Sequence, residues 1–157
     1  MKVAIFPGSF DPFTRGHEAI VSQALTMFDK VVIAIGENIT KQGFLSIEQR
    51  IRLIENLYAE QTQVEVKSYD CLTGELAQEI GACAIIRGVR NTIDFEYERN
   101  MAQVNRRLFP QIATLLLFTP AELSDVSSST IRELVTFNKD VSEMMPKGVK
   151  LEEYMTK

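Results

Sequence analysis

Thr14, Gly16 and His17 are the residues of this 157-residue chain whose types and spacing point most directly to chemistry. A hydroxyl and an imidazole can each donate a hydrogen bond to an anionic oxygen, and a glycine lets the backbone approach that anion closely. The pattern predicts a site for a nucleotide phosphate. The alternative is that His17, the only histidine in the protein, is a surface or core residue without such a role, and the residues alone leave that choice open.

The elements on either side of these residues favour the phosphate site. Residues 3–6 form a continuous apolar run that is typical of a strand buried on both faces. A loop rich in proline and glycine is predicted over residues 7–12, where regular structure should break. From Glu18 onward, apolar residues recur at helical spacing, so His17 lies where a helix begins. The first turn of a helix carries N–H groups without intrahelical partners, and the helix dipole favours an anion there.

Strands and helices alternate along the rest of the chain. Strands are predicted at residues 3–6, 31–35, 64–66, 84–86 and 114–118. Helices are predicted from residue 18, after a capping box at Ser46 and Gln49, and at residues 75–80, 93–108, 128–135 and 141–145, with a last turn at 152–154. This alternation predicts an α/β fold: one Rossmann-like domain over residues 1–157, with a five-stranded parallel sheet and helices on both faces.

Composition restricts the function classes. Hydrophobic residues make up 45% of the chain and charged residues 24%, as expected for a globular protein of one domain. The net charge of −4 argues against a nucleic-acid-binding module, which would carry a basic face. Neither an export signal nor an apolar run of transmembrane length is seen, so we expect a cytoplasmic protein without a membrane partner. Cys71 and Cys83 have no metal-ligand or disulfide spacing, and we expect free thiols in or near the core.

Ligands of parallel sheets bind beyond the carboxyl ends of the strands, so the segments that follow the strands are the ones to inspect. Lys41 lies in the polar connection over residues 37–43, where a lysine is usually only solvated. Arg87 and Arg90 flank Gly88 and Val89 after the fourth strand, and could clamp phosphates through charged hydrogen bonds. Without further information, they could equally form surface ion pairs with the acidic residues of the segment 94–98.

Four hydroxyl residues over 127–130 stand at the start of a predicted helix. One serine or threonine is an ordinary helix cap. Four in a row exceed what capping requires and suggest a second anion cradle.

These motifs together resemble those of a known family. The segments are Gly-Ser-Phe-Asp-Pro at 8–12, Thr-Arg-Gly-His at 14–17, Arg-Gly-Val-Arg at 87–90, Asp-Phe-Glu-Tyr-Glu at 94–98, Asn-Arg at 105–106 and Val-Ser-Ser-Ser-Thr-Ile-Arg at 126–132. The first two are similar to the opening of the nucleotidyltransferase superfamily, in its Thr-x-Gly-His version. The others resemble the bacterial phosphopantetheine adenylyltransferase family, and the resemblance runs to about Glu133. It implies one nucleotidyltransferase domain and a reversible reaction in coenzyme A biosynthesis, in which ATP and 4′-phosphopantetheine give dephospho-coenzyme A and pyrophosphate.

The resemblance also implies roles for individual residues. His17 would stabilise the α-phosphate during transfer, with Thr14 assisting as a donor. Ser9, Lys41, Thr73 and Arg87 match the positions that bind phosphopantetheine, and for Lys41 this replaces the interpretation as a solvated side chain. The positions that match ATP contacts are Ser9, Phe10, His17, Gly88, Val89, Arg90, Glu98, Leu123, Ser124, Asp125, Val126, Ser127, Ser128 and Ser129.

Three positions depart from the family pattern. Ser9 stands where threonine is usual and keeps the hydroxyl. Leu123 replaces a frequent aromatic residue, and Thr73 replaces a larger apolar one, so the shape of the pocket should differ there. None of these changes affects the predicted reaction type.

The resemblance further implies Mg²⁺ that enters with ATP rather than a metal site of the protein, a homohexamer, and coenzyme A as a feedback inhibitor. Two alternatives remain open from the sequence. One is another nucleotidyltransferase of the cytidylyltransferase type, which would prefer CTP. The other is a non-catalytic nucleotide sensor on the same fold, although the set of phosphate ligands looks complete.

Overall fold

Five parallel strands form one sheet in the computed structural model, in the spatial order β3-β2-β1-β4-β5. The structure describes residues 1–38, 40 and 42–155. The strands are β1 (Val3–Gly8), β2 (Lys30–Gly36), β3 (Val64–Tyr69), β4 (Ala84–Val89) and β5 (Ala113–Phe118). The helices are α1 (Arg15–Ala24), α2 (Ile47–Leu57), α3 (Thr73–Ile80), α4 (Thr92–Leu108), the short 3₁₀ helix η1 (Ala121–Leu123), α5 (Ser128–Thr136) and α6 (Glu152–Met155).

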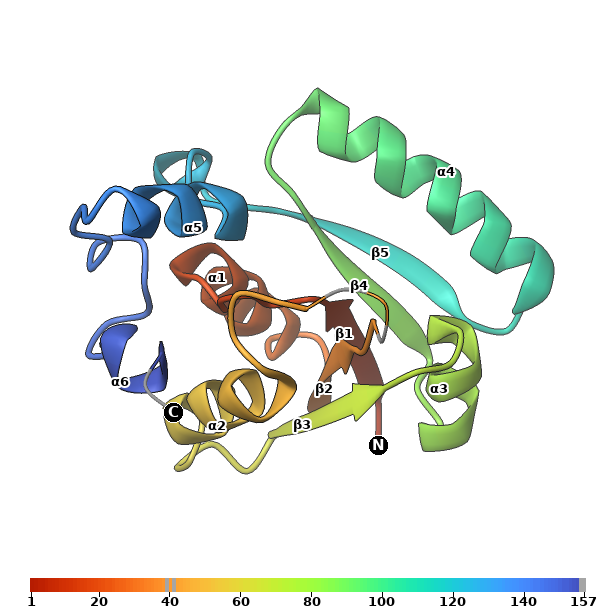
Figure 1. The fold of residues 1–157 in the computed structure, drawn as a ribbon. Coiled ribbons are helices and arrows are strands. Elements are labelled where there is room, and N and C mark those ends of the chain that lie inside the picture. The colour runs from red at the N-terminus through yellow and green to blue at the C-terminus, as the bar shows by residue number, and fades with distance from the viewer. Residues whose placement is uncertain (39, 41, 156–157) are drawn as a thin grey trace.

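Helices cover both faces of the sheet, as the sequence predicts (Figure 1). Figure 1 shows α1, α2, α5 and α6 on one side and α3 and α4 on the other. Alternate residues of a strand point to opposite faces, so each central strand feeds two cores. In β1, Phe6 packs with the larger core beneath α1, α2 and α5, whereas Ile5 packs with the smaller core beneath α3.

The two central strands separate at their carboxyl ends. β1 pairs with β2 along its whole length, from Val3 to Gly8. It pairs with β4 only at Ala4 and Ile5. Because the strand order reverses between β1 and β4, the divergence opens space at the place where ligands of doubly wound sheets bind.

Pro7 and Gly8 were expected to end β1, but both belong to the strand. The carbonyl of Pro7 accepts a hydrogen bond from Arg87 Nη1, so it faces β4. A residue in a strand directs its N–H and C=O to the same side, so the N–H that proline lacks would also face β4. The two strands have already separated there, and the missing donor costs no ladder bond. In the same way Arg87, Gly88 and Val89 were expected after β4 and form its last three residues.

The expected helix at 141–145 is wrong: hydrogen-bonded turns replace it. The carbonyls of Met144 and Met145 accept hydrogen bonds from the backbone N–H and the Nε of Arg15, at 2.9 and 3.0 Å. Pro146 follows directly, disfavours helical backbone at Met145, and has no N–H with which to continue a helix.

Two further expectations concern the surface and the thiols. Cys71 and Cys83 are free, as expected, but both are exposed rather than in or near the core; Cys71 lies after β3 and Cys83 directly before β4. Among the helices in the described part of the chain, none combines the length and apolar character needed to cross a membrane.

Candidate active site

A cavity of about 320 Å³ lies where β1 and β4 diverge. Its walls come from the ends of both strands, the loop from β1 to α1, the start of α1 and the start of α5. The predicted site residues that line it are Ser9, Phe10, Thr14, His17, Arg87, Gly88, Arg90, Val126, Ser127, Ser128 and Ser129. Segments from the two ends of the sequence therefore meet in one place.

Thr14 and His17 cap helix α1 reciprocally. The Thr14 backbone N–H donates to His17 Nδ1 at 2.9 Å, and the His17 backbone N–H donates to Thr14 Oγ1 at 3.2 Å. An imidazole occupies the place that glutamate or glutamine takes in an ordinary capping box. Because Nδ1 accepts a hydrogen bond from a backbone N–H, the proton of the neutral ring resides on Nε2.

The surroundings of His17 keep it neutral. The Phe10 and Phe13 rings lie 4.9 and 5.3 Å from the imidazole, measured between ring centroids. Burial, followed by the charges of Arg87 and Arg90, lowers the pKa of His17 to about 3. The ring is half-buried because one edge faces the cavity. His17 thus offers the cavity a neutral N–H donor, which needs no protonation to contact a phosphate oxygen.

Phe10 holds its ring in place at the cost of backbone strain. Its φ of 47° lies in the left-handed region, which costs a non-glycine residue about 1–3 kcal/mol. This conformation places the ring against Gly8, where an added Cβ would lie 3.0 Å from Phe10 Cζ. Gly8 therefore admits the aromatic ring that packs on His17.

Both arginines of the predicted phosphate clamp form ion pairs with the acidic segment. Arg87 Nε and Nη2 donate to the two carboxylate oxygens of Glu98 at 2.7 and 2.9 Å. Arg90 Nε lies 3.3 Å from Asp94 Oδ2. The Arg87 and Arg90 side chains nevertheless remain 31% and 33% exposed and line the cavity. The ion pair and the phosphate site are therefore compatible, since the carboxylates hold the guanidinium groups at the cavity wall.

The three serines at the start of α5 make different contacts. Ser127 caps the helix, accepting a hydrogen bond from the Thr130 backbone N–H at 3.2 Å. Ser128 Oγ donates to the Pro12 carbonyl at 2.7 Å, which ties α5 to the β1–α1 loop. Ser129 is exposed and lines the cavity. The N-terminus of α5 therefore presents backbone N–H groups and hydroxyls to the same space as His17.

Several predicted residues lie elsewhere. Val89 is buried and does not line the cavity, nor do Leu123, Ser124 and Asp125, which stand on η1 and the turn after it. Lys41 lies outside the described residues.

Thr73 and Glu98 line a smaller neighbouring cavity of about 180 Å³. Arg87 and Pro7 line both cavities, so the two adjoin at the end of β1 and β4. The Thr73 hydroxyl lies 2.8 Å from that of Tyr69. This contact gives the position a polar partner that the usual larger apolar residue would not need.

Sequence reasoning missed Arg132 and Thr119, which also line the larger of these two cavities. Arg132 follows Ser128 by four residues on α5, so helical periodicity places it on the same face. That spacing was a signal that could have identified it. Its Nη1 donates to the Asp11 carbonyl at 2.8 Å.

The groups around the main cavity are donors, which suit phosphate oxygens rather than a cation. Within residues 1–38, 40 and 42–155, no group of three or more His, Cys, Asp or Glu side chains could hold a metal ion. A Mg²⁺ ion that entered with a nucleotide would be bound through phosphate oxygens and would keep much of its water, so it would need no such group.

Known proteins are similar to this chain in sequence and in fold. The sequence profile described as Cytidylyltransferase-like matches residues 5–134. The phosphopantetheine adenylyltransferase of Bacteroides thetaiotaomicron is 49% identical over 151 residues, which cover 96% of this chain and 99% of that protein. The enzyme of that name from Clostridium perfringens is 41% identical over 149 residues, covering 95% and 91%.

A solved structure shows the same fold at low sequence identity. It is a bifunctional NMN adenylyltransferase/ADP ribose pyrophosphatase from Francisella tularensis, with a TM-score of 0.75 and 17% identity. The match covers 98% of this chain and 48% of that one, so this chain spans about half of its length. With the identity to the relatives above extending over nearly the whole chain, the protein belongs to the phosphopantetheine adenylyltransferase family of the cytidylyltransferase-like proteins.

Proposed function

We propose that this protein transfers the adenylyl group of ATP to 4′-phosphopantetheine, giving dephospho-coenzyme A and pyrophosphate. The observation that carries the proposal is the meeting of a neutral His17, two arginines and the N-terminus of α5 in one cavity. Each of these groups stabilises negative charge on phosphate oxygens. The family membership supplies the identity of the acceptor.

The reaction is an in-line displacement at the α-phosphorus. A phosphate oxygen of phosphopantetheine forms the new P–O bond, and the bond from the α-phosphorus to the bridging oxygen of pyrophosphate breaks with its electron pair. The attacking phosphate is already deprotonated, so no residue has to remove a proton and no covalent enzyme intermediate forms. Catalysis consists of positioning and of stabilising charge on the transferred group.

Each residue then has a task in that displacement. The Nε2–H of His17 and the Thr14 hydroxyl stabilise charge on the α-phosphate. Ser9, Lys41 and Arg87 hold the acceptor phosphate, and Thr73 lies along the acceptor beyond it. Phe10, Gly88, Arg90 and residues 126–129, which line the main cavity, bind ATP together with Ser9. The resemblance adds Val89, Glu98 and residues 123–125, which lie outside the lining of that cavity. Mg²⁺ that enters with ATP neutralises charge on its phosphates.

Pyrophosphate release tests the proposal. We expect release with ATP, Mg²⁺ and 4′-phosphopantetheine, but not with unphosphorylated pantetheine, since the acceptor phosphate is the nucleophile. A preference for CTP would instead indicate the cytidylyltransferase alternative, which the description of the matching family keeps open. ATP binding without release would indicate a nucleotide sensor and contradict the proposal.

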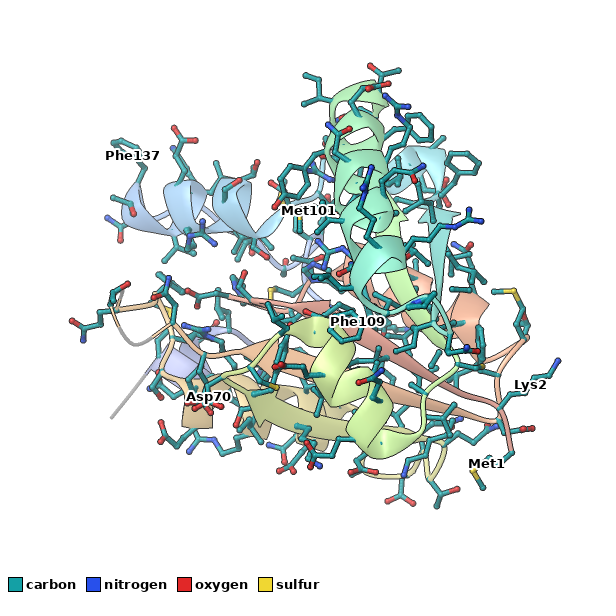
Figure 2. The ribbon with its side chains drawn as sticks, turned by 90° about the vertical axis from the view of Figure 1, so that its right-hand side faces the viewer. Met1, Lys2, Asp70, Met101, Phe109 and Phe137 are labelled. Carbon is teal, nitrogen blue, oxygen red and sulfur yellow. The ribbon has the colours of Figure 1, made fainter. Side chains whose placement is uncertain are left out.

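The protein works in the cytoplasm as a homohexamer, with coenzyme A as feedback inhibitor, as the family resemblance implies. Helix α4 supports an interface between copies. Ile93, Tyr97, Met101, Val104 and Leu108 recur at helical spacing along it, and all five side chains are exposed. Figure 2 shows α4 projecting from the body, with Met101 on its flank. Sedimentation velocity of the purified protein tests the assembly, and inhibition of pyrophosphate release by coenzyme A tests the regulation.

A further inference from the structure

A buried ion pair outside the phosphate-binding groups joins two loops of the site. Arg50 stands on α2 and Asp11 in the β1–α1 loop, and Arg50 Nε lies 3.4 Å from Asp11 Oδ1. Their side chains are only 8% and 11% exposed. Burying two charges is expensive, and a well-packed apolar pair of the same volume is often at least as stable. The pair therefore calls for an explanation other than stability.

The hydrogen bonds of the pair show what it holds. The Asp11 carboxylate accepts from the backbone N–H groups of Phe44 and Leu45 at 2.8 and 2.7 Å. Arg50 Nε and Nη2 donate to the Leu45 carbonyl at 3.0 and 2.7 Å, and Arg50 Nη1 donates to the Ser9 carbonyl at 3.3 Å. The pair thus fixes the backbone at Ser9 and at Leu45 through the same two side chains.

Gly43 shows how closely the second loop passes over the pair. A Cβ at this position would lie 1.7 Å from Arg50 Nη2 and 2.9 Å from Asp11 Oδ2. Only glycine leaves room for the charged groups and the backbone together. The backbone at Gly43 therefore passes directly over the pair.

The other side of the β1–α1 loop is held by α5. Arg132 Nη1 donates to the Asp11 carbonyl, and Ser128 Oγ donates to the Pro12 carbonyl. Ser9, Asp11, Arg50 and Arg132 also line a third cavity of about 830 Å³, which shares Ser9 and Arg132 with the main cavity. The Arg50–Asp11 pair therefore lies where the main cavity and the third cavity adjoin.

We infer that Arg50, through its pair with Asp11, is a positioning residue for the acceptor phosphate. This inference rests on the proposed function. Ser9 is proposed to hold that phosphate, and Arg50 bonds the Ser9 carbonyl while the pair holds the backbone at Phe44 and Leu45. His17 bonds Thr14, Arg90 pairs with Asp94, and Ser127 caps α5, so these nucleotide-side residues are held by contacts other than the Arg50–Asp11 pair.

Arg50→Lys tests the inference because it keeps the charge but replaces the three guanidinium nitrogens that bond the Ser9 and Leu45 carbonyls with a single ammonium nitrogen. We expect the KM for 4′-phosphopantetheine to rise about tenfold or more, since one or two charge-assisted hydrogen bonds that set the site are lost. The KM for ATP should rise less than that for phosphopantetheine, because Arg50 bonds only Ser9 among the described ATP positions, whereas Arg90 and Ser127 have other partners. Arg52→Lys, on the same helix but exposed, is the matched control and should behave like the wild type.

The outcomes separate the possibilities. If the wild-type protein shows no turnover, the proposed function is wrong, and this result says nothing about Arg50. An active wild type with an Arg50→Lys variant that loses only maximal rate, or loses affinity for both substrates alike, would overturn the positioning role. If Arg50→Lys does not fold, as judged by circular dichroism, Asp11→Asn provides the same measurement, because it removes the charge but keeps one oxygen for a backbone N–H. Gly43→Ala, which keeps both charges, should likewise raise the KM for the acceptor.

Discussion

Arg87 and Glu98 form a two-point ion pair that joins the end of β4 to the middle of α4. Glu98 is buried, unlike the other residues along α4, so this charged contact helps to seat the helix on the sheet. Arg87 also donates to the Pro7 carbonyl on β1. Within the described residues these bonds use three of the five guanidinium N–H groups, which leaves two for a phosphate at the cavity wall.

Glu98→Gln should weaken acceptor binding. The amide can accept one hydrogen bond from Arg87 but carries no charge, so the guanidinium is held less firmly. We expect the KM for 4′-phosphopantetheine to rise about tenfold, as the loss of a charge-assisted contact would cause. Steady-state kinetics measure the change, with Glu96→Gln as control because Glu96 is exposed and pairs with Arg99. A rise in the KM for ATP alone would mean that Glu98 acts on the nucleotide, as the resemblance implies, rather than on the acceptor through Arg87.

Arg87→Lys should separate the two phosphate sites. Lysine keeps the positive charge but cannot bond Glu98 at two points and face a phosphate as well. The KM for phosphopantetheine should increase about tenfold or more while the affinity for ATP changes little. Steady-state kinetics measure the first change, and isothermal titration with ATP measures the second. If only ATP affinity fell, the assignment of Arg87 to the acceptor would be wrong.

The central strands β1, β2 and β4 were predictable from the sequence because they are largely buried and contain continuous apolar runs. The edge strand β3 is only partly buried, and its alternating residues at 64–66 predicted it instead. The cap at Ser46 and Gln49 was predictable for a local reason, since both partners lie within one turn. Pro7 was not, because a proline disrupts a strand only if its missing N–H faces a partner. Whether the position of Pro7 has a partner depends on where β4 separates from β1, and the packing of the whole sheet sets that point.

The same distinction applies to the site. Thr14 and His17 were found because they lie only three positions apart in the sequence and interact locally. The Arg50–Asp11 pair joins α2 to the β1–α1 loop, and the Arg50–Ser9 bond spans 41 positions of sequence. In the sequence Arg50 is an ordinary charged residue of an amphipathic helix. Only the fold shows that it is buried against the β1–α1 loop.

His17→Ala should lower turnover without affecting ATP binding. The neutral Nε2–H is proposed to stabilise charge that develops on the α-phosphate during transfer. Losing one such donor typically costs about a hundredfold or more in kcat. Rapid-quench measurement of the first turnover, together with a binding titration for ATP, checks the two expectations. An unchanged kcat would remove the assigned role.

Gly74→Ala should lower the free energy of unfolding, because it disturbs the packing of α3 against Phe109. A Cβ at Gly74 would lie 2.0 Å from Cδ2 of Phe109, so it would clash with the ring. Phe109 is buried in the smaller core. Figure 2 shows Phe109 at the junction of α3 and α4. Overpacking of this kind costs about 1–3 kcal/mol, which exceeds the gain of about 1 kcal/mol from replacing glycine by alanine in a helix. Urea unfolding measures the loss, and Gln78→Ala, exposed on the same helix, should leave the stability nearly unchanged.

His17 should also make the stability of the protein depend on pH, and its being the only histidine makes the effect separable. Its pKa falls from the ordinary histidine value of 6.5 to about 3 in the folded protein, first through burial and then through Arg87 and Arg90. Between these pH values the unfolded chain binds a proton that the folded protein does not. The free energy of unfolding therefore decreases as the pH falls below about 6.5.

The size of this contribution follows from the slope of about 1.4 kcal/mol per pH unit for one proton. Between about pH 7 and pH 5, His17 should remove about 2 kcal/mol from the free energy of unfolding. His17→Gln lacks the titrating group but keeps a side chain suited to the capping box. Urea unfolding of both proteins at the two pH values isolates the histidine, because the other titrating groups cancel in the difference. An equal pH dependence in the two proteins would mean that His17 titrates normally in the folded state, and the neutral donor assigned to the transfer step would then be protonated below about pH 6.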